Sequence, residues 1–221
     1  CFMPVQIQAK SVTSGTDGNG NKWTYNTSAK TLTFTGNKAI SDFTLNGHDR
    51  EPSWYRWSDK TEHIVIEEGI TGIGSEAFSS FTETKSITMG ESVKRINRMA
   101  FWANVSLREI KLSSNITVIQ GDALSGGREL ETIKLPMRLR KMCSLSGQEK
   151  LEKIVMPDSI TNMQSAMFSE CKKLKYIKLP AKIRKIKSYD FAGCKKLKKL
   201  TIPKSVKTVS MSAFAGSGLK K

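Results

Sequence analysis

A repeat of about 23 residues runs through most of this chain and constrains its fold more than any other feature. The second inward-facing apolar residue of each copy recurs at gaps of 23, 23, 23, 21, 23 and 23 residues, at Ile66, Met89, Leu112, Leu135, Met156, Leu179 and Ile202. Apolar residues at fixed offsets in a period of this length are typical of a solenoid whose copies pack on one another. A solenoid presents a long regular surface, so the repeat predicts binding rather than catalysis.

Each copy opens with two apolar residues around one polar residue, as in Ile177-Lys178-Leu179, which is the alternation of a half-buried β-strand. In four copies a proline follows at once and ends the ladder, because proline has no N–H to donate. A second apolar pair, an Ala-Phe step such as Ala77-Phe78 and a closing leucine complete the copy. Stacking therefore predicts buried columns and a parallel sheet that advances about 4.8 Å per copy.

The fourth copy is two residues shorter than the others. The loss falls near Met142 and Cys143, because Leu145 still occupies the phenylalanine slot and Leu151 the closing slot. We expect a tightened turn there and an unbroken stack.

The amino-acid sequence of the repeat resembles that of a known family. Residues 174–186 read Leu-Lys-Tyr-Ile-Lys-Leu-Pro-Ala-Lys-Ile-Arg-Lys-Ile, and copies end in Phe168-Ser-Glu-Cys171, Phe191-Ala-Gly-Cys194 or Phe214-Ala-Gly-Ser217. These strings resemble the BspA-like class of bacterial leucine-rich repeats over residues 63–221, in seven copies. The resemblance implies a right-handed solenoid with a parallel β-sheet on one face and short helical or irregular turns on the other. It also implies an exported bacterial protein, at the cell surface or secreted, with a role in adhesion.

Two segments precede the repeats. Residues 1–9 resemble the end of a secretory signal peptide cleaved after Ala9, and the alternative is that Cys1 is the lipid-bearing cysteine of a lipoprotein. Residues 10–62 are expected to form a small β-rich cap, with a hairpin whose strands include Trp23–Tyr25 and Thr31–Phe34. We expect Trp23, Trp54 and Trp57 to seal the first repeat, although they could instead form a sugar-stacking platform.

Outward-facing strand positions form the candidate binding ribbon. Its two columns are His63, Ser86, Glu109, Thr132, Lys153, Tyr176, Lys199 and Val65, Thr88, Lys111, Lys134, Val155, Lys178, Thr201. Sequence variation among the copies falls on these positions. This pattern fits a free binding face, and it also fits simple exposure to solvent.

The net positive charge of the chain lies entirely in its second half. Residues 1–110 contain 12 Lys or Arg and 12 Asp or Glu, whereas residues 111–221 contain 24 and 8, which accounts for the net charge of +16. A candidate polyanion patch, called the basic flank below, comprises Arg138, Arg140, Lys141, Arg184, Lys185 and Lys187. Such a field attracts anionic polymers, and the alternative is a solvated lysine-rich surface. The lysines have no interleaved aromatic residues, which argues against specific nucleic-acid binding.

The cysteines and the known catalytic motifs contribute little to the prediction of function. Cys171 and Cys194 occupy the same slot of consecutive copies, so they are either buried thiols or a disulfide. No cysteine spacing or histidine pair predicts a metal site, and no nucleophile or phosphate-loop motif is present. Asp190 stands in an alanine slot, where a displaced turn would let it face water, the alternative being a buried functional carboxylate.

The sequence therefore predicts a monomeric, non-catalytic exported protein without cofactor or transmembrane segment. Its partner would be a host or cell-surface protein, or an anionic cell-wall polymer or glycan. Two alternatives stay open: a targeting module of a larger exported enzyme, and a spacer.

Overall fold

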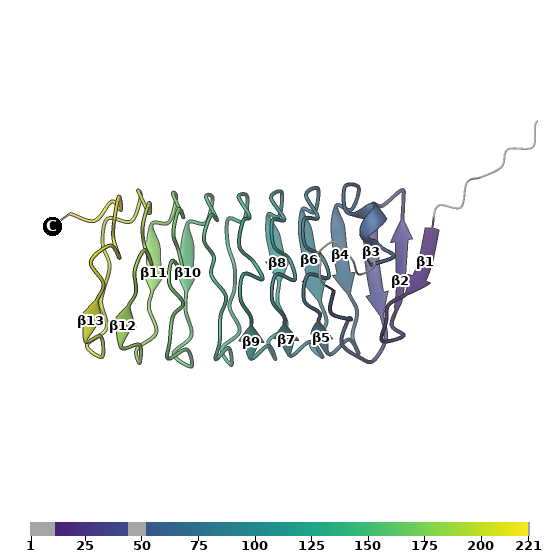
Figure 1. Ribbon diagram of the computed structural model, residues 1–221, viewed down its shortest axis with the longest axis horizontal. Coiled ribbons are helices and arrows are strands. Elements are labelled where there is room, and N and C mark those ends of the chain that lie inside the picture. Colours follow the sequence, from purple (N-terminus) through teal and green to yellow (C-terminus); the bar gives the residue numbers. More distant parts are fainter. Residues whose placement is uncertain (1–11, 44–51, 221) are drawn as a thin grey trace, which may run out of the picture.

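The protein is an elongated β-solenoid in the computed structural model, which describes residues 12–43 and 52–220 (Figure 1). The leucine-rich repeat fold expected from the sequence is confirmed, whereas the proposed signal-peptide remnant lies outside the described residues. Six strands form the main sheet: β1 (Val12–Thr16), β2 (Lys22–Asn26), β3 (Thr31–Thr35), β4 (His63–Ile66), β6 (Ser86–Met89) and β8 (Glu109–Lys111). The same repeat slot forms a further parallel pair, β10 (Lys153–Val155) and β11 (Tyr176–Lys178).

A second row of short strands lies on another side of the coil, where irregular turns were expected (Figure 1). Its strands are β5 (Gly72–Ile73), β7 (Arg95–Ile96), β9 (Val118–Ile119), β12 (Lys185–Ile186) and β13 (Thr208–Val209). The isoleucines of β5, β7, β9 and β12 are buried. Each of these isoleucines is buried at the same position of its coil. The backbones of neighbouring coils therefore lie in register and pair in parallel.

Inward side chains form the continuous columns that the repeat predicts. In the phenylalanine column, the rings of Phe78 and Phe101 stack with centroids 5.4 Å apart, and Phe168 and Phe191 stack at 5.7 Å. Leu124 fills the same slot between these pairs and is buried. Stacked apolar columns bury the face that one copy alone would expose, so each coil depends on its neighbours.

The described part of the N-terminal segment extends the main sheet beyond the first coil. The predicted hairpin is confirmed, because β2 and β3 pair antiparallel, and β3 continues in parallel onto β4. Strand β1 was missed, since its residues 12–16 lie partly in a stretch interpreted as a turn. Trp54 is buried before the 3-10 turn η1 (Tyr55–Trp57), where it packs edge-on against Phe34 and donates its indole N–H to the carbonyl of Ala77 at 2.9 Å.

The main ladder is interrupted at two steps of the described solenoid, between the third and fourth copies and between β11 and residues 199–201. The first of these interruptions bears on the binding surface. In the described chain, neither a β-bridge nor a backbone hydrogen bond joins residues 108–112 to residues 131–135, although Thr132 bridges Lys153 on the other side. We call this interrupted step the seam.

In the shortened fourth copy, residues 142–145 form no turn, whereas the preceding copy has one at 121–126, so the tightened turn expected near Met142 and Cys143 is not seen there. The apolar residues of this copy stay buried, and the stack of coils is unbroken, as expected. The parallel sheet is not continuous, which corrects the expectation that the strands of all copies line up as one sheet.

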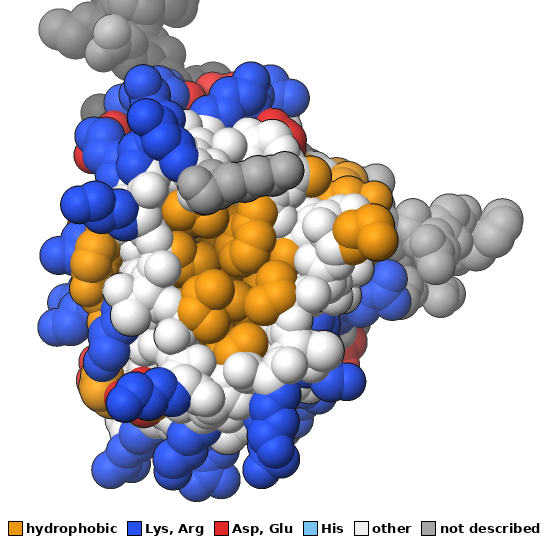
Figure 2. Space-filling model, turned by 90° about the vertical axis from the view of Figure 1, so that its left-hand side faces the viewer, with side chains coloured by type: hydrophobic (Ala, Val, Ile, Leu, Met, Phe, Trp, Pro, Cys, Tyr) orange, Lys and Arg blue, Asp and Glu red, His pale blue; other side chains and the backbone are white. Residues whose placement is uncertain are grey.

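The end of the solenoid near β13 presents an apolar surface (Figure 2). Orange side chains fill the centre of this face, and lysine and arginine side chains lie around its edge. An open hollow there is lined in part by Leu200, Ile202, Phe214 and Leu219. No helix in the described part of the chain combines the length and apolar content that crossing a bilayer requires.

Candidate binding surface

The two ribbon columns lie on the outer side of the main sheet. From β8 onward every ribbon residue is exposed, namely Glu109, Lys111, Thr132, Lys134, Lys153, Val155, Tyr176, Lys178, Lys199 and Thr201. Nearer the cap, His63, Ser86 and Val65 are only partly exposed, and His63 Nδ1 lies 2.8 Å from the hydroxyl of Ser86. The most accessible part of the ribbon therefore starts at β8.

An apolar and basic cluster occupies the ribbon at β10 and β11. Tyr176 is 49% exposed and Val155 is 44% exposed, which is unusual for large side chains on a solvated sheet. The ammonium of Lys153 lies 5.3 Å from the Tyr176 ring centroid, and Lys178 lies 3.7 Å from the carboxylate of Asp158. A partner could thus contact an aromatic ring and an aliphatic side chain between two cations.

A groove of about 670 Å³ opens over the seam. One wall comes from β8 and the turn after it, including Glu109, Lys111 and Leu112, and the other from residues 132–138. Lys111 and Lys134 belong to the predicted ribbon, but the groove itself was not predicted. Leu112 and Met137 were not expected to form part of a surface. Met137 could have been noticed, because other copies carry Glu91, Ser114 or Asp158 at its slot.

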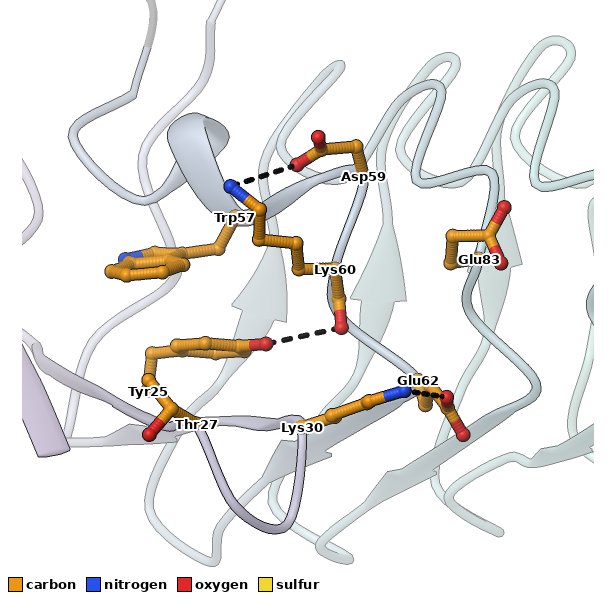
Figure 3. Close-up of a pocket in the computed structure, with 8 residues that line it drawn as sticks. All are labelled: Tyr25, Thr27, Lys30, Trp57, Asp59, Lys60, Glu62 and Glu83. Carbon is orange, nitrogen blue, oxygen red and sulfur yellow. Dashed lines mark hydrogen bonds and ion pairs between the residues drawn. The ribbon is translucent and has the colours of Figure 1, made fainter. Parts of the chain in front are cut away.

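A smaller hollow of about 280 Å³ lies where the cap meets the first coil (Figure 3). The Trp57 ring stacks on Tyr25 at 4.3 Å, and the ammonium of Lys60 lies 5.7 Å from the Trp57 ring centroid. Glu62 pairs with Lys30 at 2.6 Å and with Lys85 at 2.5 Å, so hydrogen bonds from Lys30 and then Lys85 lower the pKa of Glu62 to about 2.

The arrangement of the tryptophans favours the cap over the sugar platform. Trp23 and Trp54 are buried, which confirms the expectation for these two, and Trp57 is half-buried. The ring of Trp23 fills the space beside Gly15, where a Cβ atom would lie 2.7 Å from the indole. Two of the three indoles therefore have no free face for a sugar.

The residues of the basic flank divide between two places. Arg140 precedes Lys141, which bridges Val118 on the side of the short strands, and Lys185 lies on β12 on that same side. Arg138 instead lines the groove. Between these coils the equivalent residues are the uncharged Thr161 and Asn162. None of the six basic side chains makes an ion pair within residues 12–43 and 52–220.

Asp190 is buried, so the expectation that it would face water was wrong. Its carboxylate accepts the backbone N–H of Lys187 at 2.7 Å and that of Met167, in the previous coil, at 3.3 Å. These two donors make burial possible, because they replace part of the hydration of the charge. Desolvation nevertheless raises the pKa of Asp190 to about 6. The carboxylate has no access to solvent, and its contacts are those of a structural group.

Cys143, Cys171 and Cys194 are free, buried thiols. Cys171 donates to the carbonyl of Leu145 at 3.3 Å, and Cys194 makes the equivalent contact with Phe168 one coil later, at 3.0 Å. Burial raises the pKa of Cys143 and of Cys194 to about 12, which removes the thiolate needed for reactivity. Within the described residues, no three His, Cys, Asp or Glu side chains gather as a possible metal site.

Comparison with solved structures shows the same fold elsewhere. A leucine-rich repeat protein from Bacteroides ovatus is 23% identical with a TM-score of 0.73, and the match covers 97% of this chain and 58% of that one. The T. pallidum leucine-rich repeat protein TpLRR is 19% identical with a TM-score of 0.64, over 91% of this chain and 84% of its own. The present chain thus spans little more than half of the B. ovatus protein. No curated protein matches this sequence.

The sequence profile of the "BspA type Leucine rich repeat region (6 copies)" matches residues 51–146 and 141–221. These matches span the cap junction, the seam and the basic half, and they cover well over half of the chain. The protein belongs to the BspA-type leucine-rich repeat family.

Proposed function

We propose that this protein is a non-catalytic binding module of the bacterial exterior, at the cell surface or secreted, that holds a host or cell-surface partner on its ribbon. The observation that carries the proposal is the exposed stretch of ribbon from β8 to β11, where Val155 and Tyr176 lie open among lysines. Exposed apolar groups framed by polar ones are typical of interaction sites. A buried core and an exposed face that varies from coil to coil suit a scaffold for recognition.

A matched pair of charge variants tests this proposal. The ribbon variant changes Lys111, Lys134, Lys153 and Lys178 to glutamate, and the flank variant changes Arg140, Lys141, Arg184 and Lys185 to glutamate. Both remove the same charge from exposed positions, so a general electrostatic effect would be equal in the two. Binding to a panel of host matrix proteins and other host or cell-surface proteins should fall at least tenfold in the ribbon variant alone. Equal binding by all three proteins would contradict the proposal.

The flank variant also tests the proposed polyanion binding. The six flank cations make no ion pair in the described chain, which favours attraction of an anionic polymer. Lysine-rich contacts are screened over about 8 Å at physiological salt. Heparin retention well above physiological ionic strength, lost in the flank variant, would support this role. Elution at or below that ionic strength would reduce the flank to a solvated surface.

A second candidate function is that of a targeting or spacer module in a longer exported enzyme. The observation that favours it is that the chain spans only 58% of the B. ovatus protein. Reading the gene on both sides of this sequence tests it: an adjoining catalytic domain would support the candidate, and the absence of one would contradict it.

A further inference from the structure

We propose that the groove over the seam binds a short, extended polypeptide segment that carries acidic side chains next to an apolar one. This inference rests on the proposed function, since it names the chemistry of a partner for the same ribbon. Four features of the groove lead to it: its floor, its rim, its charge and its backbone.

The floor of the groove is apolar core that the interrupted sheet leaves partly uncovered. Leu112 is only partly buried, whereas Ile66 and Met156 in the same column are 1% and 0% exposed. Leu112 is the most exposed residue of its column apart from Ile202 in the last coil, so an apolar side chain of a ligand can contact it at the floor of the groove.

The rim adds an exposed apolar side chain held by an ordered backbone. Met137 is 76% exposed, and its carbonyl accepts the hydroxyl of Ser159 from the next coil at 3.0 Å. The same hydroxyl lies 2.6 Å from the carbonyl of Leu139, so the turn that carries Met137 is fixed at both ends. Methionine adapts its shape to a partner at small energetic cost. A flexible apolar side chain on a fixed turn suits contact with a ligand.

The charge of the groove selects acidic partners. Lys111, Lys134 and Arg138 line it, and none of them makes an ion pair in the described residues. Glu91 lies at its edge, but its carboxylate accepts the N–H and the hydroxyl of Ser114 at 2.8 and 2.6 Å. Those bonds occupy Glu91 in organising the wall, which leaves Glu109 as the one carboxylate of the lining without a contact in the structure. Three cations against one free carboxylate favour an acidic ligand.

The backbone favours a polypeptide over an anionic glycan. Along the seam, the N–H and C=O groups that pair with an adjacent coil at β4, β6 and β8 make no such bonds between residues 108–112 and 131–135. Extended peptides bind commonly through backbone groups of this kind, with side chains held in neighbouring pockets. The floor offers aliphatic groups and no aromatic ring, so it matches a leucine-like side chain better than a sugar.

Fluorescence polarisation with labelled five-residue peptides tests the inference on the full chain. An Asp-Leu-Asp-Leu-Asp peptide should bind, while Asp-Ser-Asp-Ser-Asp should bind at least tenfold more weakly. Lys134→Glu should weaken binding of the first peptide at least tenfold, whereas Lys204→Glu, at an exposed lysine outside the groove and the ribbon, should change it less than twofold. Met137→Ser should weaken it about threefold to tenfold, and Met211→Ser, at a fully exposed methionine outside the groove, should have no effect.

Each remaining outcome overturns the inference. Equal binding of both peptides, or equal losses in Lys134→Glu and Lys204→Glu, would show general electrostatic attraction. No binding at millimolar peptide would show that the groove is not a peptide site. If the peptide fails while the ribbon variant still loses its partner in the panel, only this inference falls. If the peptide binds but the ribbon variant keeps all partners, the proposed function falls instead.

Discussion

The cap end and the seam both involve the main sheet, but they differ in how many of their backbone, apolar and charged groups have partners within the protein. At the cap, three antiparallel strands run into β4, Trp54 packs among phenylalanine rings, and Glu62 is paired with two lysines. At the seam the ladder stops, Leu112 is partly uncovered, and Lys111, Lys134 and Arg138 make no ion pair within the described residues. The junction of the cap with the first coil thus pairs its strands, rings and charges with one another. The seam leaves backbone, apolar and charged groups available to a ligand.

The difference shows that a solenoid can open its surface without opening its core. Leu139, Leu145 and Leu151 in the fourth copy are fully buried, although residues 131–135 of that copy make no ladder with β8. Side-chain columns and backbone ladders are separate interactions, so the ladder can stop while the columns persist.

The strongest test of the cap is Trp54→Ala. Truncation of a large buried aromatic residue typically costs about 3–5 kcal/mol of unfolding free energy, and this change also leaves the Ala77 carbonyl without its donor. Trp102→Ala is the matched control, because Trp102 is 38% exposed and surface changes usually stay within about 0.5 kcal/mol. Urea denaturation measures both. A loss in Trp54→Ala no larger than in the control would mean that the cap does not seal the solenoid.

Thiol labelling tests whether the core of the seam copy is as closed as we claim. Cys143 lies where that copy is shortened, and burial raises its pKa from the usual 9.0 to about 12. At pH 8 the thiolate fraction, and so the labelling rate, should fall by about a thousandfold relative to denatured protein. The experiment uses a Cys1→Ser background, so that only the three buried thiols report. Rapid labelling of Cys143 alone would show that the seam reaches the core.

Asp190→Ala tests whether the carboxylate of Asp190 is buried and desolvated in the folded protein. Because burial raises the folded pKa from 3.8 to about 6, the folded state binds the proton more tightly than the unfolded state. Wild-type stability should therefore fall, relative to the variant, as pH rises from 4 to 7, by at most about 3 kcal/mol. Asp158→Ala, which removes an exposed carboxylate one coil earlier, serves as control. A wild-type-to-variant difference that does not change with pH would contradict the buried, desolvated carboxylate.

A smaller effect comes from one turn position that has positive φ along the solenoid. A non-glycine residue occupies it at Ser80, Ala103 and Glu170, and glycine occupies it at Gly126, Gly147 and Gly193. Alanine at positive φ is strained, so Ala103→Gly should raise the unfolding free energy by about 0.5–1 kcal/mol. Ala215→Gly, whose φ is not positive, should lower it by a similar amount. Thermal denaturation should show opposite shifts, and equal signs would refute the strain.

Much of this architecture could be predicted from the sequence because it depends on periodicity. The columns, the cap hairpin and the outward register of Lys153 or Tyr176 all follow from which residues are apolar and how far apart they lie. The short strands β5, β7 and β9 could not be predicted, since two residues are too few to show an alternation.

The site was harder to predict for physical reasons. A groove depends on whether two backbones reach bonding distance, and side-chain spacing does not report that distance. Asp190 was misplaced because its backbone donors come partly from another coil, at Met167. Met137 carried a signal, an apolar residue in a polar slot, but its meaning required the neighbouring seam.

Amide hydrogen exchange tests the central claim, that the sheet is open at the seam and available to a ligand there. In the free protein, amides of residues 131–135 should exchange more than about tenfold faster on average than those of β6, because they lack a ladder with β8. Adding the Asp-Leu-Asp-Leu-Asp peptide should slow exchange at 108–112 and 131–135 and leave β4 and β6 unchanged. Equal protection of the seam and β6 in the free protein, or slowing spread evenly along the solenoid, would contradict the account.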